Sequence, residues 1–443
     1  MKKDTIFASV TKNQKTAISI IRISGPKSKV IAKKLLRKEL KTNFAHLRKI
    51  YSINNEYIDQ GIAIFFSKLN SSTGEDVLEL HVHGSFAVIT KIEHELCKIK
   101  NVREAEPGEF TKRSFYNNKL DLLQVEGLED LLDSSTDLQR KQANLSFMGS
   151  VSSRLELWKQ DLIELASFIE TAIDFSDEVL PEETIKIFNF KLQKLKSKIK
   201  EANGLAEYSK KVREGVRVII TGPPNAGKSS LINCILDENL SIVTDEPGTT
   251  RDIISSTVDI DGILVNFYDT AGLHDTKNNI EAEGVRRAKE LLEISDIQIR
   301  VVDGSDTCWR KNLIKIPKLN DLTIDLINKS DLVEIKIKKG DNCYNVSTKT
   351  NHNIKDFKKA LKKNIKQVVN KGFEPIIFRD RHLKISNMLF ECLNRIELKD
   401  IYSSPELIAE DIRHALSLIG KITGTVGVED ILDNLFKRFC IGK

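Results

Sequence analysis

The sequence predicts a multidomain protein of mixed α/β and α+β class, in which an α/β domain is inserted into a helical domain. Two changes in the spacing of apolar residues indicate this organisation. Strand-like runs give way to helical spacing near residue 118, and strands alternate with helices from 212 to 372. We therefore expect an α+β domain at 1–117, a helical domain in two parts at 118–211 and 373–443, and between them an α/β domain at 212–372 with a parallel-rich sheet and flanking helices.

Local patterns within these domains support the division. Residues 17–24 (AISIIRIS), 61–66 (GIAIFF) and 77–84 (VLELHVHG) have the apolar, β-branched character of strands, and residues 87–99 (AVITKIEHELCKI) have helical spacing. From Lys119 to about residue 210, apolar residues recur at helical spacing, with a break at Pro181. The first residues of that series are Leu120, Leu123, Leu128, Leu131 and Leu132.

The composition is that of a soluble globular protein, with 40% hydrophobic and 30% charged residues. No apolar run approaches the ~18–20 residues of a membrane span, and the N-terminus lacks the apolar core of a signal peptide. The six scattered cysteines form no C-x-x-C pair, which argues against a zinc site or a redox pair. We expect a cytoplasmic protein without membrane contact. The net charge of +6 is a mild basic bias, so charge alone favours a solvated surface over an RNA-binding one.

Residues 222–229 (GPPNAGKS) form a phosphate-binding loop of the G-x-x-x-x-G-K-S type. The strand-like run VRVIIT precedes the loop and a helical segment follows it, which is the context that this motif requires. Backbone N–H groups of the loop and of the helix N-terminus attract phosphate oxygens. We expect Lys228 to reach the β- and γ-phosphates and Ser229 to offer its hydroxyl to Mg²⁺.

A downstream motif predicts that the base is guanine. NKSD at 328–331 supplies Asp331, whose carboxylate accepts hydrogen bonds from two N–H groups on the guanine edge. Adenine presents the wrong pattern of donors and acceptors. The segment VSTKT at 346–350, which contains Ser347, is spaced to bring a backbone amide to the guanine oxygen.

Two motifs between the loop and NKSD are assigned to the γ-phosphate and Mg²⁺. DTAG at 269–272 places Asp269 near Mg²⁺ through water and Gly272 against the γ-phosphate, and GTTRD at 248–252 supplies a threonine for the Mg²⁺ shell. This order of motifs is that of a GTPase. Ras-like proteins position the attacking water with a Gln after D-x-x-G, but Leu-His-Asp follows here. His274 is one candidate for that role, and an exposed loop histidine is the alternative.

Longer segments resemble the MnmE (TrmE) family of tRNA-modification GTPases. They are GPPNAGKSS, TDEPGTTRD, DTAGL, NKSD and FCIGK, together with IRISG, TGEDVLELHVHG, EPGEFTKRSFYNNKLDL and AIDFSDE, and they cover the whole chain. The resemblance implies a folate-binding-like N-terminal domain and a Ras-like P-loop G domain inserted into a helical domain. Pro223 and Pro224 replace the more usual Arg-Pro of the loop, a change that we expect to be tolerated.

The resemblance also implies the residues of the nucleotide site. Mg²⁺ would be bound by Ser229 and Thr250, and the catalytic carboxylate that orients water would be Glu281, with an ordinary helix-surface charge as the alternative. A K⁺ ion would neutralise developing charge as an arginine finger does, and its ligands would be Asn225, Thr244, Glu246 and Thr249. The residues implied to contact GTP are Asn225, Ala226, Gly227, Lys228, Ser229, Ser230, Thr244, Asp245, Glu246, Pro247, Gly248, Thr249, Thr250, Asp269, Thr270, Ala271, Gly272, Asn328, Lys329, Ser330, Asp331 and Ser347.

Cofactors and partners follow from the same resemblance. Arg22, Glu79, Lys119 and Lys443 would bind a tetrahydrofolate one-carbon derivative at a homodimer interface of the N-terminal domain, and Cys440 is a candidate for a role in the reaction. FAD would be held by an MnmG-type partner protein in a heterotetramer, since this chain has no G-x-G-x-x-G fingerprint. Together the two proteins would add an aminomethyl or carboxymethylaminomethyl group at C5 of the wobble uridine in certain tRNAs.

Other interpretations have less support in the sequence. A ribosome-assembly GTPase, acting as an RNA-binding switch, would need a C-terminal RNA-binding module, whereas residues 373–443 have helical spacing. The terminal CIGK departs from a prenylation box because Gly442 is not aliphatic and Lys is an unusual last residue. His81 and His83 on one strand are weak evidence for a metal site. Arg300 lies in an apolar strand, where a charge is costly unless it is paired or reaches solvent.

Overall fold

The structure is a computed structural model. It describes residues 4–10, 15–174, 181–236, 256–269, 290–333, 335, 342–369, 379–426, 435, 436, 439 and 442. The chain forms two compact units, of which one joins residues 1–129 to residues 417–443 and the other comprises residues 130–416. Both ends of the chain therefore belong to the same unit. The finer division at residues 117, 211 and 372 stays a prediction.

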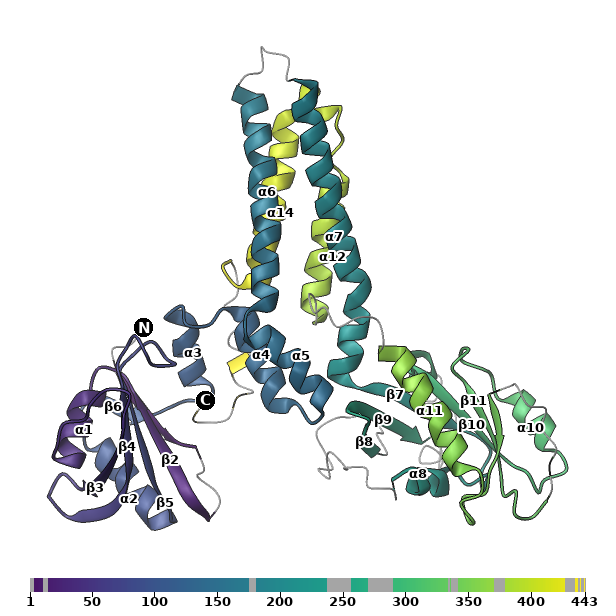
Figure 1. Cartoon of the computed structure of the whole chain (residues 1–443), viewed down its shortest axis with the longest axis horizontal. Helices are drawn as coiled ribbons and strands as arrows, with labels where there is room; N and C mark the ends of the chain where they lie inside the picture. The colour runs from purple at the N-terminus through teal and green to yellow at the C-terminus, as the bar shows by residue number, and fades with distance from the viewer. Residues whose placement is uncertain are drawn as a thin grey trace, which may run out of the picture. The chain divides into compact units, whose positions relative to one another are not determined.

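The first unit is an α+β fold built on a six-stranded sheet. Its strand order is β3-β4-β5-β2-β1-β6, and neighbouring strands are antiparallel except for β1 and β6. The strands predicted at 17–24, 61–66 and 77–84 are confirmed within β2, β4 and β5, and the helix predicted at 87–99 is confirmed as α2, which ends at Cys97. The elements, shown in Figure 1, are β1 (Thr5–Ser9), β2 (Thr16–Ser24), α1 (Ser28–Leu36), β3 (Ala45–Tyr51), β4 (Tyr57–Phe66), β5 (Val77–Gly84), α2 (Phe86–Cys97), β6 (Val102–Glu104) and α3 (Glu109–Tyr116).

Alternation along these strands gives the sheet one buried face and an opposite face that is covered at β1, where Ile6 and Ala8 pack with Phe110 of α3, and exposed at other strands. The buried face forms a hydrophobic core with α1 and α2. The opposite face, which we call the open sheet face, carries Ile18, Arg22, Leu47, Ile62 and Glu79. Its apolar side chains stay in solvent, since Ile18 is 62% exposed and Leu47 is 63% exposed. Large apolar groups on the exposed part of a sheet face are typical of a surface that receives a partner.

The C-terminal segment packs into the first unit. Leu435, Phe436 and Phe439 are buried and form a hydrophobic cluster with Leu122 and Val125 of α4 (Leu122–Asp133). The tail then reaches β1, because a Cβ on Gly442 would lie 3.7 Å from the Cβ of Ala8.

The second unit contains long helices with heptad-like spacing. In α6 (Ser150–Asp174) and α7 (Glu182–Glu214), buried residues recur at alternating intervals of four and three, and α7 packs against α6 and α12 (Figure 1). Pro181 is the N-cap residue of α7, consistent with the expected break. No helix within the described residues is long and apolar enough to cross a membrane. The other helices of this part are α5 (Asp137–Phe147), α12 (Asp380–Asn394), α13 (Asp400–Ser403) and α14 (Pro405–Thr423), the last of which extends into the first unit.

The long helix α7 leads directly into the α/β part of the second unit. It continues past residue 211 to Glu214, and Gly215 then turns the chain into β7 (Val216–Thr221) with a φ of 91°. The carbonyl of Glu214 accepts a hydrogen bond from Asn266 Nδ2 at 2.9 Å, and the carbonyl of Arg213 accepts one from Gln139 Nε2 at 2.8 Å. The helix end is thus hydrogen-bonded both to the sheet and to α5.

The α/β part confirms the predicted parallel-rich sheet. The strand order is β12-β11-β10-β7-β9-β8, with parallel neighbours except for β8, which is antiparallel to β9. A single hydrophobic cluster joins the sheet to α8 and α11. The elements that follow β7 are α8 (Lys228–Leu236), β8 (Ser256–Ile260), β9 (Ile263–Asp269), β10 (Ile297–Asp303), α10 (Trp309–Lys315), β11 (Ile324–Asn328), β12 (Cys343–Asn345) and α11 (Ile354–Val369).

Candidate nucleotide-binding site

The phosphate-binding loop connects the end of β7 to the start of α8. Two residues of the loop have left-handed backbone conformations, Asn225 with φ 62° and Gly227 with φ 92°. At Gly222 a Cβ would lie only 2.1 Å from the carbonyl oxygen of Val301 on β10. Gly222 is therefore needed for close packing against β10, and Gly227 for its left-handed backbone. The backbone amides of the loop lie next to the N-terminus of α8, where a phosphate can bind.

Lys228 lies at the first position of α8 and is largely buried. Its Nζ donates hydrogen bonds to the carbonyls of Gly222 at 2.9 Å and Pro223 at 3.1 Å. Burial lowers the pKa of this ammonium, while the carboxylate of Asp269 acts in the opposite direction. The loop thus holds the lysine charge beside its own backbone, where a phosphate would meet it.

Ser229 and Asp269 lie together, as their assignment near Mg²⁺ requires. Ser229 Oγ donates a hydrogen bond to Asp269 Oδ2 at 3.2 Å. Asp269 ends β9, and its register partner Ile220 lies on β7 just before the loop. A hydroxyl and a carboxylate are the oxygen ligands that suit Mg²⁺, so these two residues fit the metal.

Asn328 connects the two sides of the site. Its Nδ2 donates to the carbonyl of Ala226 at 3.0 Å, and its Oδ1 accepts from the amide of Thr348 at 3.1 Å. The side chain is only 1% exposed, and a Cβ on Gly227 would lie 2.2 Å from its amide nitrogen. The first residue of NKSD therefore joins the phosphate loop to the segment after β12. The motif alone did not reveal this bracing role.

Asp331 and Ser347 were expected to meet the base, and the structure brings them together. Ser347 Oγ donates to Asp331 Oδ1 at 2.7 Å, and this hydrogen bond lowers the pKa of the carboxyl below its usual value. Ser330 is held beside them, since its amide donates to the carbonyl of Val346 at 3.1 Å. The carboxylate is thus ionised and oriented, as an acceptor for the guanine edge must be.

Lys329 is anchored from the end of β10. Its Nζ lies 2.5 Å from Asp303 Oδ2, and its backbone is left-handed with φ 64°. Although burial acts to raise the pKa of Asp303, hydrogen bonds from Lys329 and Ser305 hold it below its usual value. The ion pair therefore fixes the lysine at the rim of the site.

Residues from both sides of the site line one pocket. Its volume is about 720 Å³, within the ~300–1,000 Å³ typical of ligand sites. One wall is the phosphate loop with the start of α8, and the other is the NKSD segment with residues 347–349. The lining residues are Pro224, Asn225, Gly227, Lys228, Ser229, Ser230, Asn328, Lys329, Asp331, Leu332, Ser347, Thr348 and Lys349.

Comparisons with known proteins match this architecture along the whole chain. Residues 122–440 match a family model described as the MnmE helical domain, and residues 5–119 match one described as the GTP-binding protein TrmE N-terminus. The chain belongs to the MnmE (TrmE) family. Among its relatives, the tRNA modification GTPase MnmE of Pelagibacter ubique is 37% identical, with 99% of this chain and 100% of the relative covered. The mitochondrial tRNA modification GTPase gtpbp3 of Dictyostelium discoideum is 35% identical, with 100% and 95% covered.

Solved structures align with a smaller part of the chain. The FeoB G domain of Methanococcus jannaschii is 21% identical over 34% of this chain and 98% of its own, with a TM-score of 0.25. Era of Aquifex aeolicus bound to GDP and AlF4⁻ is 24% identical over 41% of this chain and 67% of its own, with a TM-score of 0.26.

Several expected MnmE residues lie outside the described residues. For the nucleotide site they are Thr244, Asp245, Glu246, Pro247, Gly248, Thr249, Thr250, Thr270, Ala271, Gly272, His274 and Glu281. For the N-terminal site they are Cys440 and Lys443. The K⁺ site, the catalytic carboxylate and the tail chemistry therefore stay predictions.

In the TrmE N-terminal region, two of the four expected folate residues form an ion pair. Arg22 on β2 and Glu79 on β5 are register partners, and Arg22 Nε donates to Glu79 Oε1 at 2.9 Å. Lys119 instead donates to the carbonyl of Leu69 at 2.7 Å. His81 and His83 contact separate carboxylates, Glu79 and Asp59. No cluster of three or more metal-binding side chains occurs among the described residues.

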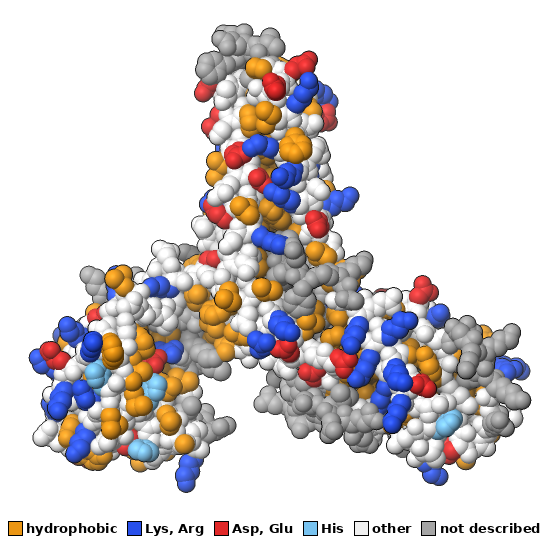
Figure 2. Space-filling view, in the orientation of Figure 1, with side chains coloured by type: hydrophobic (Ala, Val, Ile, Leu, Met, Phe, Trp, Pro, Cys, Tyr) orange, Lys and Arg blue, Asp and Glu red, His pale blue; other side chains and the backbone are white. Residues whose placement is uncertain are grey.

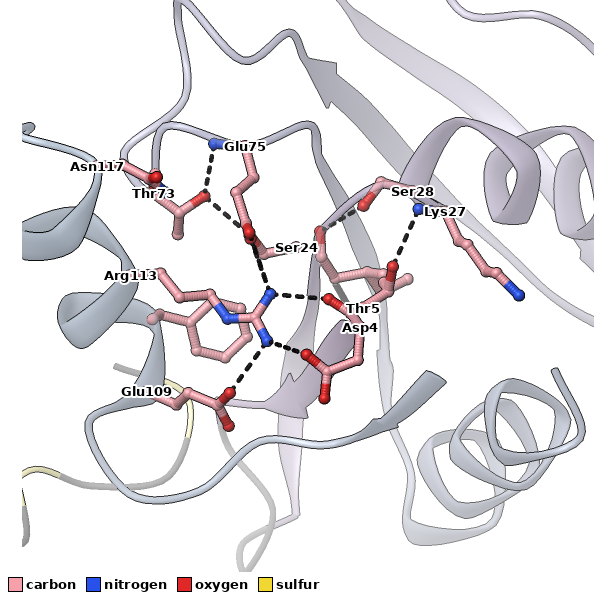
Figure 3. Close-up of polar contacts among 12 residues, drawn as sticks. Asp4, Thr5, Ser24, Lys27, Ser28, Thr73, Glu75, Glu109, Arg113 and Asn117 are labelled. Atoms are coloured by element: carbon pink, nitrogen blue, oxygen red, sulfur yellow. Dashed lines mark hydrogen bonds and ion pairs between the residues drawn. The ribbon is translucent and has the colours of Figure 1, made fainter. Parts of the chain in front are cut away.

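A charge network that sequence reasoning missed anchors α3 to the start of the chain. Arg113 is 4% exposed and bridges three carboxylates, those of Asp4 at 3.0 Å, Glu75 at 2.9 Å and Glu109 at 3.0 Å (Figure 3). Arg103 contacts Asp4 and Glu109 as well. The acidic and basic residues of EPGEFTKR gave a local signal, but the contact with Asp4 spans 109 positions and depends on the fold.

Proposed function

We propose that this chain is a GTPase that acts in tRNA modification. The observation that carries the proposal is the oriented pair of Asp331 and Ser347 across the pocket from Lys228, in a chain whose whole length matches the MnmE family. The carboxylate recognises guanine, and the loop with Lys228 holds phosphates. Water attack on the γ-phosphate then yields GDP and inorganic phosphate.

Two measurements test this proposal. The purified chain is expected to hydrolyse GTP, and ATP hydrolysis should be far slower because adenine cannot pair with Asp331. Mass spectrometry of tRNA nucleosides from cells that lack the protein should show a loss of the modified wobble uridine. An unchanged wobble uridine would contradict the proposed role in tRNA modification. Equal hydrolysis of GTP and ATP would contradict the assignment of guanine as the base.

For hydrolysis, we assign the oxygen ligands to two ions. Mg²⁺ would be bound by Ser229 and Thr250, with Asp269 acting through water, and it would neutralise charge on the β- and γ-phosphates. K⁺ would be bound by Asn225, Thr244, Glu246 and Thr249. Asn225 lines the pocket, which supports a role beside the phosphates.

Glu281 is our candidate for the group that orients water. A Glu281→Ala change should slow single-turnover hydrolysis by about 10²–10³-fold, the scale expected for one positioned catalytic group, while nucleotide affinity is retained. A rate within about threefold of the parent would mean that Glu281 is an ordinary surface charge without a catalytic role.

For the N-terminal region, we propose a homodimer that binds a tetrahydrofolate one-carbon derivative. The open sheet face offers apolar side chains together with the Arg22–Glu79 pair. A carboxylate suits the donor edge of a pterin, and cations suit the folate glutamate. Gly442 lies against β1 at Ala8, whose partner across the ladder is Arg22, so the tail approaches this same group of residues.

The modification chemistry would need a second protein. We propose an MnmG-type partner that holds FAD and joins this chain in a heterotetramer, which adds an aminomethyl or carboxymethylaminomethyl group at C5 of the wobble uridine. A ribosome-assembly switch is less well supported, because residues 122–440 match the MnmE helical domain and the described part of residues 379–426 forms helices α12–α14.

A further inference from the structure

The outer surface of α11 carries six lysines at regular helical spacing. They stand at positions i, i+3, i+4, i+7, i+8 and i+11, which one face of an α-helix presents together. We call this surface the lysine face, and its residues are Lys355, Lys358, Lys359, Lys362, Lys363 and Lys366. Over 11 positions at ~1.5 Å each, it extends for about 16 Å.

The other side of α11 fixes this orientation. Phe357, Leu361 and Ile365 are buried in the core of the parallel sheet, so the helix cannot turn its lysines inward. Figure 2 shows Lys and Arg side chains gathered over this helix of the α/β part. The packed helix therefore holds the six lysines on one outward surface, with their backbone positions at regular spacing.

Two carboxylates pair with three of these lysines. Asp356 pairs with Lys359 at 3.3 Å, and Asp261 pairs with Lys362 at 2.8 Å and Lys366 at 2.9 Å. The six lysines outnumber these two carboxylates, so the surface carries an excess of positive charge. Like charges at i and i+4 destabilise an isolated helix by a few tenths of a kcal/mol per pair. A helix that only needed to be solvated would be more stable with both signs interspersed.

We propose that the lysine face binds the phosphate backbone of tRNA, an inference that rests on the proposed tRNA substrate. A compact ammonium group is a point charge that suits phosphate, and a regular row of them on one helix face matches a polyanion with repeating charges. The exposed positions of α11 carry no aromatic or arginine side chain that would stack on a base. The contact is therefore to the backbone and independent of sequence, and it leaves the choice of the wobble base to other parts of the assembly.

The test uses the full-length chain and a tRNA transcript with uridine at the wobble position. The variant is the triple substitution Lys355→Gln, Lys359→Gln and Lys363→Gln, since Gln preserves helix propensity. The matched control removes three exposed lysines of α7, by Lys186→Gln, Lys194→Gln and Lys200→Gln. Each triple contains one lysine with an acidic partner in its own helix, Lys359 with Asp356 and Lys186 with Glu182. Both variants change the net charge equally.

We expect the α11 variant to bind tRNA at least about tenfold more weakly at low salt, and the slope of log affinity against log salt to fall by about three, one unit per lost phosphate contact. The α7 control should keep the parental affinity and slope. GTP hydrolysis should be unchanged in both, and the thermal midpoint of the α11 variant should not fall, because the substitutions remove like-charge repulsion along the helix. Equal affinity of the α11 variant and the parent would overturn the inference and would favour an acidic protein as the partner. An equal loss in both triples would also overturn it, and a parent that binds no tRNA would remove the proposed substrate itself.

Discussion

Arg300 and Asp325 form a bidentate ion pair across the neighbouring parallel strands β10 and β11. Arg300 Nε donates to Asp325 Oδ1 at 2.6 Å and Nη2 donates to Oδ2 at 2.8 Å, and the two residues are register partners. Arg300 Nη1 also donates to the carbonyl of Ile316 at 2.7 Å, at the C-terminal end of α10. A charge in an apolar strand is costly unless it is paired, and the charge of Arg300 is paired. The same guanidinium connects α10 to the sheet.

Removal of Arg300 should be more damaging than removal of the pair. We expect Arg300→Met to destabilise the α/β part by about 2–3 kcal/mol, because Asp325 keeps its charge without a partner at a largely buried position. The double variant Arg300→Met and Asp325→Leu should recover part of that loss. Urea unfolding followed by fluorescence measures both effects, with Lys359→Met at a surface pair as the control. A double variant as unstable as the sum of the two single variants would contradict this.

Loss of the Asn328 side chain should weaken nucleotide binding. Asn328→Ala leaves the carbonyl of Ala226 and the amide of Thr348 without their partner, at a cost of about 1–3 kcal/mol. Because these groups belong to the two walls of the pocket, GDP affinity should fall by about tenfold or more. A fluorescent GDP analogue measures the change, and Asn312→Ala on α10 serves as the control. Parental affinity in Asn328→Ala would show that the walls hold their positions without this brace.

The charge network around Arg113 predicts a loss of stability in acid. Burial acts to raise the pKa of both the Asp4 and the Glu109 carboxyl. For Asp4, a hydrogen bond from Arg103 and the charges of Arg103 and Arg113 hold the pKa below the usual 3.8. For Glu109, hydrogen bonds from Arg103, Arg113 and the backbone of Glu106 hold the pKa below the usual 4.5. The stabilisation is therefore complete above the usual values and disappears as pH falls through the lowered ones. The thermal midpoint should drop below about pH 4.5.

A substitution at Glu109 tests this network. Glu109→Gln should lower the thermal midpoint at pH 7 and flatten its fall below about pH 4.5, because one of the titrating carboxyls is gone. Glu201→Gln, at an exposed position of α7, is the control and should follow the parent curve. A Glu109→Gln variant with the parental pH profile would show that this carboxyl does not contribute to the loss of stability in acid.

The K⁺ assignment predicts a specific ion response at Asn225. GTP hydrolysis should be faster in K⁺ than in Na⁺ at matched ionic strength, because the larger ion fits a cage of carbonyl and side-chain oxygens. Since Asn225 has a φ of 62°, Asn225→Gly removes the amide without the backbone strain of alanine. This variant should lose the K⁺ response and keep its GDP affinity. Equal turnover of the parent in both salts would exclude the site.

Deletion of residues 440–443 should separate the two activities of the chain. The deletion spares Phe436 and Phe439, which are buried beside α4, so the fold of the first unit should persist. We expect tRNA modification to be abolished and GTP hydrolysis to be unchanged, because the nucleotide motifs lie in the other unit. Modified-uridine content and GTPase rate are measured together, and Cys440→Ser examines the thiol alone. Full modification by the truncated chain would mean that the tail is dispensable.

Local patterns carried most of the prediction of the fold and of the nucleotide site. The phosphate loop and NKSD act through neighbouring residues whose spacing is visible in the sequence, and the structure places both on one pocket. Strand and helix periodicity likewise revealed β2, β5 and α2, since alternation and helical spacing are local properties. The folate, K⁺ and partner assignments came from the resemblance alone, because no spacing of residues encodes them.

What the sequence by itself determined was the fold class, the order of its parts and the nucleotide motifs. The tertiary structure decided which distant residues meet. The pairing of β10 with β11 places Asp325 beside Arg300, and the packing of loops and helices onto the sheets brings Asn328 to Ala226 over 102 positions and Arg113 to Asp4 over 109 positions. These contacts depend on which elements become neighbours, and that choice is a balance of burial and chain entropy over the whole unit. No local pattern therefore indicates that a charge in a strand will be paired or that a motif asparagine will act as a brace.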